Sequence, residues 1–392
     1  MITNASVYQY ATVGKWLLGT GGMVVGMIHV GGLTRLTSSG LSMTDWSVTG
    51  SLPPMNEEAW LAEFDRYKQY PEWQQRKSMT LDEFQYIFAW EYGHRMLGRV
   101  VGLVFVMPWI YFSVKGKIPK GYQMRMMGLG LMGGTQGLVG WWMVKSGLTD
   151  DRRGDPNQIR VKPIRLASHL SMAFATYAAL LWTGWDVLGM AHSKDMIEYV
   201  NASSKEALRH ASRVRVVAVA VTSLTAVTIV SGALVAGNDA GRTYNTWPKM
   251  GDDWIPAEVV SGDKPFSKRA VEDSATVQFN HRLLGQVTGV AALAMVGLAR
   301  PHLMTPQARR GLTAVGLATT AQVVLGITTL LNYVPISLAA VHQLGSVVVF
   351  TSGLYLVHSL RYASPALLRQ AARALGKEGA MVASVAKKVV PV

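Results

Sequence analysis

The sequence predicts an all-α integral membrane protein, in which eight transmembrane helices form two tandem four-helix bundles related by an internal repeat. Of its 392 residues, 49% are apolar and only 16% are charged, whereas soluble proteins carry about a quarter charged residues. The apolar residues gather in runs long enough to cross a bilayer, which takes ~20 residues as a helix. We expect membrane spans at 14–34, 90–114, 124–144, 165–189, 214–237, 279–299, 312–333 and 338–360.

The internal repeat relates the two halves of the chain. The stretch EYGHRMLGR at 91–99 returns as QFNHRLLGQ at 278–286, so that His94 aligns with His281. TQGLVG similarly matches AQVVLG, and SGLSMTDW resembles DAGRTYNTW. Four spans per half would return the chain to its starting side, which makes the repeats parallel. We therefore expect an N-terminal bundle at 1–190, a connector at 191–213 and a C-terminal bundle at 214–392 that ends in a basic tail.

The net charge of +14 is distributed unevenly along the chain. Basic residues gather at 115–125, at 300–310 and in the C-terminal tail, whereas the alternate loops are acidic or mixed. This asymmetry places both termini on the cytoplasmic or matrix side. No stretch combines basic and aromatic residues in a nucleic-acid pattern, so we expect no nucleic-acid partner. The first dozen residues resemble no targeting segment.

The absence of cysteine limits the chemistry. Disulfides, thiolate ligands, iron–sulfur clusters and covalently attached c-type haem are all excluded. Four histidines instead lie near the expected outer ends of the even-numbered spans, two in each half: His94, His169, His281 and His342. Two imidazoles can clamp a haem iron from opposite faces. Zinc is the alternative metal, but two histidines per half are too few ligands for it. Two bis-histidine haem sites toward the outer side are the better interpretation.

The two predicted sites differ at one charged position. Glu91 lies three residues before His94, on the same helix face, whereas Gln278 fills the equivalent position before His281. The asymmetry suggests one reactive haem and one haem that carries electrons. The alternative interpretation is that Glu91 simply pairs with an arginine near the interface. His29 has Val230 as its repeat equivalent, and we assign it no functional role.

Over residues 14–360, the chain resembles a known family, the haem A synthases. The segments that carry the resemblance are GGLTRLTSSGLSMTDW, MTLDEFQYIF leading into EYGHRMLGR, QGLVGWWMVKSGL, RLASHL, AGRTYNTWPKM, NHRLLG and VHQLG. The acidic insertion at about 55–85 resembles the mitochondrial and alphaproteobacterial branch. The outer-loop cysteine pairs of some bacterial members are absent here.

The resemblance implies oxidation of the C8 methyl of haem O to the formyl group of haem A, through hydroxylated intermediates, for cytochrome c oxidase biogenesis. It implies haem b held by His281 and His342, the haem O substrate held by His94 and His169, and Glu91 as the catalytic carboxylate. Guanidinium groups pair well with carboxylates, so four arginines are candidates for contacting haem propionates: Arg35, Arg95, Arg242 and Arg282.

The expected partners are haem O synthase, an electron-transfer partner, membrane lipid and a second copy of the chain in a homo-oligomer. The expected location is the mitochondrial inner membrane, with the bacterial plasma membrane as the alternative. A non-enzymatic di-haem cytochrome is the main competing function, but it offers no reason for Glu91 to differ from Gln278. A transporter built from inverted repeats fits less well, because these repeats are parallel and no broken helix is evident.

Overall fold

The computed structural model describes residues 4–45, 47, 49–148, 159–190, 193–261, 264–375 and 380–388. Trp46 of the SGLSMTDW motif and residues 191–192 of the expected connector lie outside the described residues. The described chain is all-helical and contains no strand beyond an isolated bridge between Met250 and Asp253. The long helices are α1 (Asn4–Leu36), α3 (Leu81–Val114), α4 (Gln123–Leu148), α5 (Pro163–Gly189), α7 (Lys205–Gly237), α10 (Ser274–Leu298), α11 (Pro306–Leu331) and α12 (Ile336–Ser359).

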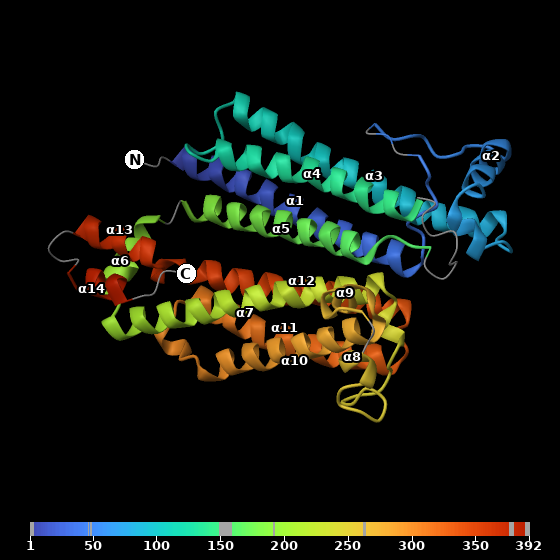
Figure 1. The fold of residues 1–392 in the computed structure, drawn as a ribbon. Coiled ribbons are helices and arrows are strands. Elements are labelled where there is room, and N and C mark those ends of the chain that lie inside the picture. The colour runs from blue at the N-terminus through green and yellow to red at the C-terminus, as the bar shows by residue number, and fades with distance from the viewer. Residues whose placement is uncertain are drawn as a thin grey trace.

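The long helices lie in two groups along a common direction (Figure 1). One group contains α1, α3, α4 and α5, and the other contains α7, α10, α11 and α12. The groups meet where α1 and α5 pack against α12 and α7. Phe174 contacts Phe350 edge-on, with ring centroids 5.5 Å apart, and the hydroxyls of Tyr177 and Thr351 hydrogen-bond at 2.8 Å. The interface therefore combines apolar packing with polar contacts.

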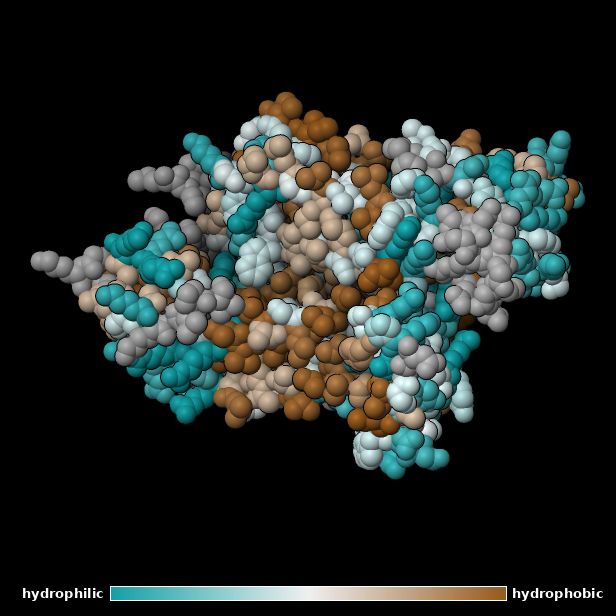
Figure 2. Space-filling view, viewed as in Figure 1, coloured by the Kyte–Doolittle hydropathy of each residue, from teal (hydrophilic) through white to brown (hydrophobic). Residues whose placement is uncertain are grey.

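The surface and the helix composition both indicate a multi-pass membrane protein. Apolar side chains dominate the middle of the molecule, between hydrophilic ends (Figure 2). Seven of the described helices are long and apolar enough to cross a membrane. They correspond to seven of the eight expected spans. The remaining span, 124–144, is helical in α4 but is less apolar, because glycines, Gln136 and the terminal Arg125 and Lys145 dilute its hydrophobic residues.

Short elements cover the two ends of the long helices (Figure 1). At one end lie α2 (Glu57–Tyr67), η1 (Pro71–Gln75), η5 (Ala240–Arg242), α8 (Ala257–Val260) and α9 (Phe266–Glu272). At the other end lie α6 (Ser193–Ala202), α13 (Pro365–Leu375) and α14 (Ala380–Lys388). The connectors η6 (Pro301–Leu303) and η7 (Arg361–Ala363) complete the described helices. In the acidic insertion, an aromatic cluster that includes Phe64, Tyr67 and Phe84 anchors α2 to the start of α3.

Local capping fixes where the histidine-bearing helices begin. Thr80 and Glu83 form a capping box at the start of α3, with each side chain bonded to the other residue's backbone N–H. The Asp273 side chain accepts a hydrogen bond from the Thr276 N–H at the start of α10. A proline begins α5, where its missing N–H costs nothing. The helices α3, α5, α10 and α12 all begin at the end where α2, α8 and α9 lie.

Candidate functional site

Each of the four histidines singled out by the sequence rests against a glycine of a neighbouring helix. A Cβ atom at Gly31 of α1 would lie 2.8 Å from Nε2 of His94, and one at Gly140 of α4 would lie 2.8 Å from Cε1 of His169. Real Cβ contacts are essentially never shorter than 3.0 Å. At positions 31 and 140, only glycine therefore leaves enough room for these two imidazole rings.

The second group repeats this packing. A Cβ atom at Gly232 of α7 would lie 3.0 Å from Cε1 of His281, and one at Gly326 of α11 would lie 2.9 Å from Cε1 of His342. All four imidazole rings thus pack so closely against a helix glycine that a methyl group there would crowd them. The four histidine residues keep some exposed surface.

The histidines also associate in pairs within each group. His94 and His169 lie close enough for their charges to interact, and so do His281 and His342. Among the described residues, no three or more histidine, aspartate or glutamate side chains gather as a metal site. A structural zinc site needs about four ligands, so these residues do not build one. Paired imidazoles instead match the two axial ligands that a haem iron takes.

The hydrogen bonds around His281 define which ring nitrogen is free. The Ser231 hydroxyl donates to the Thr228 carbonyl at 2.7 Å, and the same oxygen lies 2.8 Å from Nδ1 of His281. Because the serine proton is already used, Nδ1–H of His281 donates to Ser231 and Nε2 keeps its lone pair. A neutral imidazole with one nitrogen so held is the form that ligates a metal.

Glutamine side chains support the other member of each pair. Nε2 of Gln136 donates to the His169 carbonyl at 3.1 Å and lies 3.2 Å from Nδ1 of that ring. Nε2 of Gln322 likewise donates to the His342 carbonyl at 2.9 Å. Nδ1 of His342 is buried with no hydrogen-bond partner among the described residues. The two glutamines, already matched by the sequence repeat, therefore brace equivalent turns of α5 and α12.

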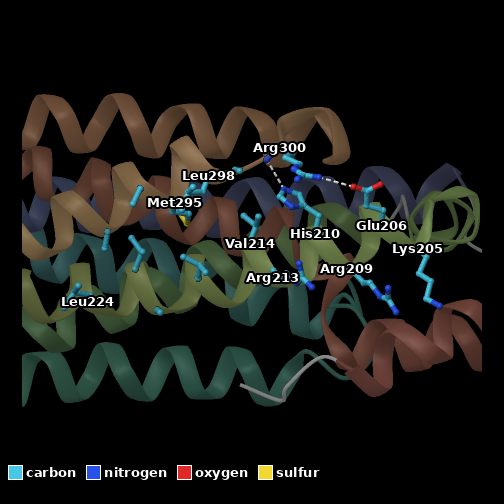
Figure 3. A pocket seen from close by; sticks show the side chains of 16 residues that line it. Lys205, Glu206, Arg209, His210, Arg213, Val214, Leu224, Met295, Leu298 and Arg300 are labelled. Carbon is cyan, nitrogen blue, oxygen red and sulfur yellow. Dashed lines mark hydrogen bonds and ion pairs between the residues drawn. The ribbon is translucent and has the colours of Figure 1, made fainter.

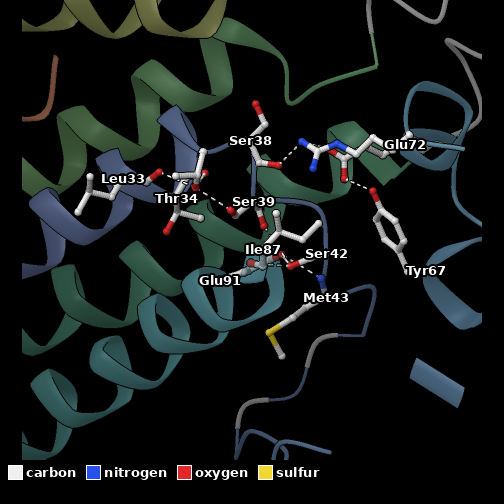
Figure 4. Close-up of polar contacts among 12 residues, drawn as sticks. Leu33, Thr34, Ser38, Ser39, Ser42, Met43, Tyr67, Glu72, Ile87 and Glu91 are labelled. Atoms are coloured by element: carbon white, nitrogen blue, oxygen red, sulfur yellow. Dashed lines mark hydrogen bonds and ion pairs between the residues drawn. The ribbon is translucent and has the colours of Figure 1, made fainter. Parts of the chain in front are cut away.

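Glu91 is buried at 3% exposure and holds the loop that follows α1. One carboxylate oxygen accepts hydrogen bonds from the Ser42 hydroxyl at 2.7 Å and from the Met43 N–H at 2.9 Å (Figure 4). The other oxygen forms an ion pair with Nη2 of Arg95 at 2.6 Å. The arginine pairing that the sequence offered as the alternative interpretation of Glu91 is therefore present.

Gln278 makes contacts of the opposite polarity in the second group. Its Nε2 donates to the carbonyls of Gly241 at 3.3 Å and Tyr244 at 3.0 Å, and its Oε1 is buried without a partner among the described residues. The loop after α7 therefore presents acceptors where the loop after α1 presents donors. A carboxylate suits the first environment and would be repelled by the second.

The four arginines proposed for propionates divide into two kinds. Arg95 donates to the carbonyls of Met43 and Asp45, and Arg282 donates to those of Tyr244, Thr246 and Lys249. Both guanidiniums thus tie the loop that follows α1 or α7 to a helix.

The other two lie nearer the surface. Arg35 at the end of α1 forms an ion pair at 2.8 Å with Asp239 of the second group, which Arg160 also contacts at 3.0 Å. The Arg242 side chain is exposed and makes no hydrogen bond or ion pair with the described residues, although its backbone N–H donates to the Asp239 carbonyl at 3.4 Å. Arg242 therefore has the freest guanidinium of the four.

A second buried acid, not identified from the sequence, lies in the acidic insertion. Glu72 is 6% exposed and accepts a hydrogen bond from the Tyr67 hydroxyl at 3.0 Å (Figure 4). Arg76 lies 3.9 Å from its carboxylate and donates to the Ser38 carbonyl at 2.8 Å. Burial raises the pKa of Glu72 from 4.5 to about 7, against the opposing influence of Arg76.

This pKa predicts that the stability of the acidic insertion depends on pH. Between about pH 4.5 and 7 the folded chain binds a proton that the unfolded chain has lost, so stability falls as pH rises through this window. Hydrogen exchange of residues 57–76 should therefore be faster at pH 8 than at pH 5.5, after correction for the intrinsic exchange rate. The Glu72→Gln variant should lose most of that difference. An equal pH response in the variant would assign the effect to another group.

Two adjacent glycines of α1 connect the two groups of helices. Gly31 packs against His94, while Gly32 is in contact with the side chain of Gln343, which would have to move to admit a Cβ. Nε2 of Gln343 donates to the Ile28 carbonyl of α1 at 3.1 Å. Gln343 follows His342 directly in the chain. A single turn of α1 therefore contacts one histidine of the first pair and the neighbour of a histidine in the second pair.

Sequence reasoning missed the glycines, although the repeat carried the signal. Gly31 and Gly232 are 201 positions apart, like Gly40 and Gly241 in the segments after α1 and α7. Gly140 and Gly326 are separated by 186, like the two supporting glutamines. No comparable signal pointed to Ser42 or Met43. Nδ1 of His29 is buried without a described partner, and no role for this residue follows from its surroundings.

The fold and the site define a class: a multi-pass helical membrane protein with one pair of glycine-backed histidines in each of two helix groups. The chain belongs to the cytochrome oxidase assembly protein family, whose model matches residues 14–354. The resemblance seen in the sequence motifs is thereby confirmed.

Similar proteins come from mitochondria and bacteria. Heme A synthase COX15 of Arabidopsis thaliana is 44% identical over 358 residues, which cover 91% of this chain and 76% of the relative. Heme A synthase of Paracoccus denitrificans is 40% identical over 351 residues, covering 88% and 87%. A heme A synthase–mitochondrial ferredoxin fusion protein of Schizosaccharomyces pombe is 38% identical over 367 residues, covering 89% and 60%.

Proposed function

We propose that the chain is a haem A synthase, which oxidises the C8 methyl of haem O to a formyl group through hydroxylated intermediates for cytochrome oxidase assembly. Membership of the family and the names of its relatives support the reaction. The observation that carries the proposal is the difference between two otherwise similar histidine pairs. The Glu91 carboxylate stands three residues before His94 in one pair, and the neutral Gln278 stands three residues before His281 in the other.

The residues present fit two haem groups. The hydrogen bond at Nδ1 of His281 leaves its Nε2 free to bind a metal, and all four histidine residues are partly exposed. Glycines at 102, 133 and 137 on α3 and α4 face open space, with no atom within 4 Å of an added Cβ. A flat macrocycle needs such room. In this proposal His281 and His342 hold haem b, and His94 and His169 hold the haem O substrate. Bound haem b would supply one-electron redox chemistry.

Glu91 is the carboxylate that would act on the substrate. Arg95, Ser42 and the Met43 N–H fix both of its oxygens, so its position costs no reorganisation during the reaction. A fixed negative charge near the reacting methyl can stabilise positive charge that develops there, or it can accept a proton. Gln278 could do neither. Arg242 and, less freely, Arg35 remain the candidates for propionate contacts, because the other two arginines hold loop carbonyls.

The turn of α1 at Gly31 and Gly32 supports communication between the two sites. Gly31 contacts His94, and Gly32 contacts the side chain that follows His342. This turn therefore joins the pair that would hold the substrate to the pair that would hold haem b. The fused ferredoxin of the fission yeast relative supports a ferredoxin-type electron-transfer partner. Haem O synthase as the supplier of substrate, and a homo-oligomer, also remain part of the proposal.

The arrangement in the membrane completes the proposal. We infer eight spans in two tandem bundles, at 1–190 and 214–392 with a connector between them, and count α4 as the eighth because it accompanies its group over 26 residues. Helices α1 and α7 support the repeat, since they end 201 positions apart, at Leu36 and Gly237. The basic segments orient both termini toward the matrix or cytoplasm, with the histidines toward the other side. The mitochondrial inner membrane or the bacterial plasma membrane is the location.

The glycine contacts predict a specific loss of haem. Gly326→Ala forces Cβ against the His342 ring, so haem b affinity should fall by about tenfold or more, as for other displaced metal ligands. Gly297→Ala on α10 is the matched control, because its Cβ would meet no atom within 4 Å. The Soret absorbance per chain of the two purified variants measures the effect. Equal haem content would show that the glycine is not needed to seat the ligand.

The proposed reaction is tested by expression in a host that makes haem O but has no haem A. Chromatography of the total haem should reveal haem A only when the chain is present. A protein that purifies with two haem B groups and yields no haem A would instead be a di-haem electron-transfer cytochrome, and the enzymatic proposal would fail.

A further inference from the structure

An open groove of about 870 Å³ runs between α7 and α10 (Figure 3), at the end of α10 opposite to His281. Its walls are apolar and its mouth is basic. Small side chains, Ala220 on α7 and Ala291 and Ala294 on α10, leave the space between the helices. Val214, Val217 and Leu224 on one side and Met295 and Leu298 on the other complete the apolar walls.

The length of the groove matches one leaflet of a bilayer. The apolar wall of α7 extends from Val214 to Leu224, ten residue steps or ~15 Å of helix. Half of the ~30 Å hydrocarbon core of a membrane has the same thickness. The basic mouth begins one position before Val214, at Arg213. The change from apolar to basic therefore occurs where acyl chains give way to headgroups.

The mouth carries surplus positive charge. Lys205, Arg209 and Arg213 follow one another at intervals of four residues, so they form a stripe on one face of α7. None of these three side chains has an acidic partner among the described residues. The acid in the mouth, Glu206, is 3.1 Å from Arg300 and so compensates a different cation.

His210 adds a neutral contact to the mouth. Its Nε2 accepts a hydrogen bond from the Arg300 N–H at 2.9 Å, which leaves the ring proton on Nδ1. This bond also holds the start of η6 against α7, and so fixes the two sides of the mouth relative to each other. The three cations of the stripe thus lie on a braced support.

We propose that this groove binds an anionic phospholipid, with one acyl chain between α7 and α10 and the phosphate at Arg209 and Arg213. Uncompensated basic residues at the mouth of an apolar crevice between membrane helices recognise such headgroups. An acidic soluble protein would match the charge, but it would leave the apolar walls unused. The site is separate from the proposed haem chemistry and lies at the opposite end of the helices.

The test uses the purified, delipidated full-length protein in detergent. Dioleoylphosphatidylglycerol, dioleoylphosphatidylcholine and glycerol 3-phosphate are titrated separately, and binding is followed by native mass spectrometry and by the melting temperature. The anionic lipid should bind one per groove and raise the melting temperature. The Arg209→Gln/Arg213→Gln double variant should bind it about tenfold or more weakly. Ala294→Leu adds bulk to the apolar wall, so it should weaken binding of the anionic lipid by leaving less room for the acyl chain.

The control is Arg309→Gln/Arg310→Gln, an exposed basic pair on α11 that lies outside the groove. It should bind the anionic lipid like the parent, and all variants should keep the parent's Soret absorbance and lipid-free melting temperature. Three results would overturn the proposal: equal binding of the two lipids, equal weakening by the α11 pair, or binding of glycerol 3-phosphate as tight as that of the lipid. If the Ala294→Leu variant bound the lipid with the parent's affinity, this would likewise show that no acyl chain occupies the groove.

Discussion

Replacing Glu91 with glutamine should stop the conversion of haem O while both histidine pairs still bind haem. The variant loses the negative charge, and roughly a 100-fold or greater loss of rate is expected for a group that stabilises charge or moves a proton in the reaction. Haem O should accumulate in the purified protein. The ratio of haem O to haem A in extracts, together with the Soret absorbance per chain, measures both parts of this result.

A second variant is needed to separate the loss of the Glu91 charge from the loss of loop structure, because Glu91 also anchors the loop after α1. Ser42→Ala removes one hydrogen bond to the carboxylate and keeps its charge. Loss of such a bond costs about 1 kcal/mol, so we expect this variant to retain most of its conversion. If Glu91→Gln converts haem O normally, the catalytic role is wrong. If Ser42→Ala is as inactive as Glu91→Gln, anchoring of the loop is what matters.

Removing histidines should have different consequences in the two halves. His281→Ala and His342→Ala should lose haem B, and conversion should fall with it because electrons can no longer leave the substrate site. His94→Ala and His169→Ala should keep one haem B per chain and lose the bound haem O. Chromatography of the haems extracted from each variant distinguishes these patterns.

His302→Ala is the matched control for these variants, since His302 is exposed on η6, which follows the end of α10 opposite to His281. It should retain the haem composition of the parent. Loss of haem B from the His94 or His169 variants, with haem O retained, would reverse the assignment of the two sites. Retention of both haems in all four variants would exclude these histidines as ligands.

The helices and the histidine positions could be predicted from sequence because their signals are local or repeated. Apolar runs of membrane length mark the helices, and the His-Arg-x-Leu-Gly frame occurs twice. The weakest of these predictions concerned 124–144, where glycines and Gln136 reduce the apolar content of α4 although the segment remains helical.

The contacts that orient the site could not be predicted, because they join residues far apart in the chain. Ser42 and Met43 reach Glu91 across nearly fifty positions, and Gln343 reaches Ile28 across 315. Nothing in the pattern around Arg95 indicates that it holds loop carbonyls. Such pairings depend on how helices pack, which sequence periodicity does not specify.

The central claim is that one histidine pair holds a prosthetic haem and the other holds the substrate. Chromatography of the haems extracted from the purified parent protein tests it most directly. The account predicts haem B together with haem O, haem A or a hydroxylated intermediate. Haem B alone, at two per chain, would contradict it, because both pairs would then hold the same electron-carrying group.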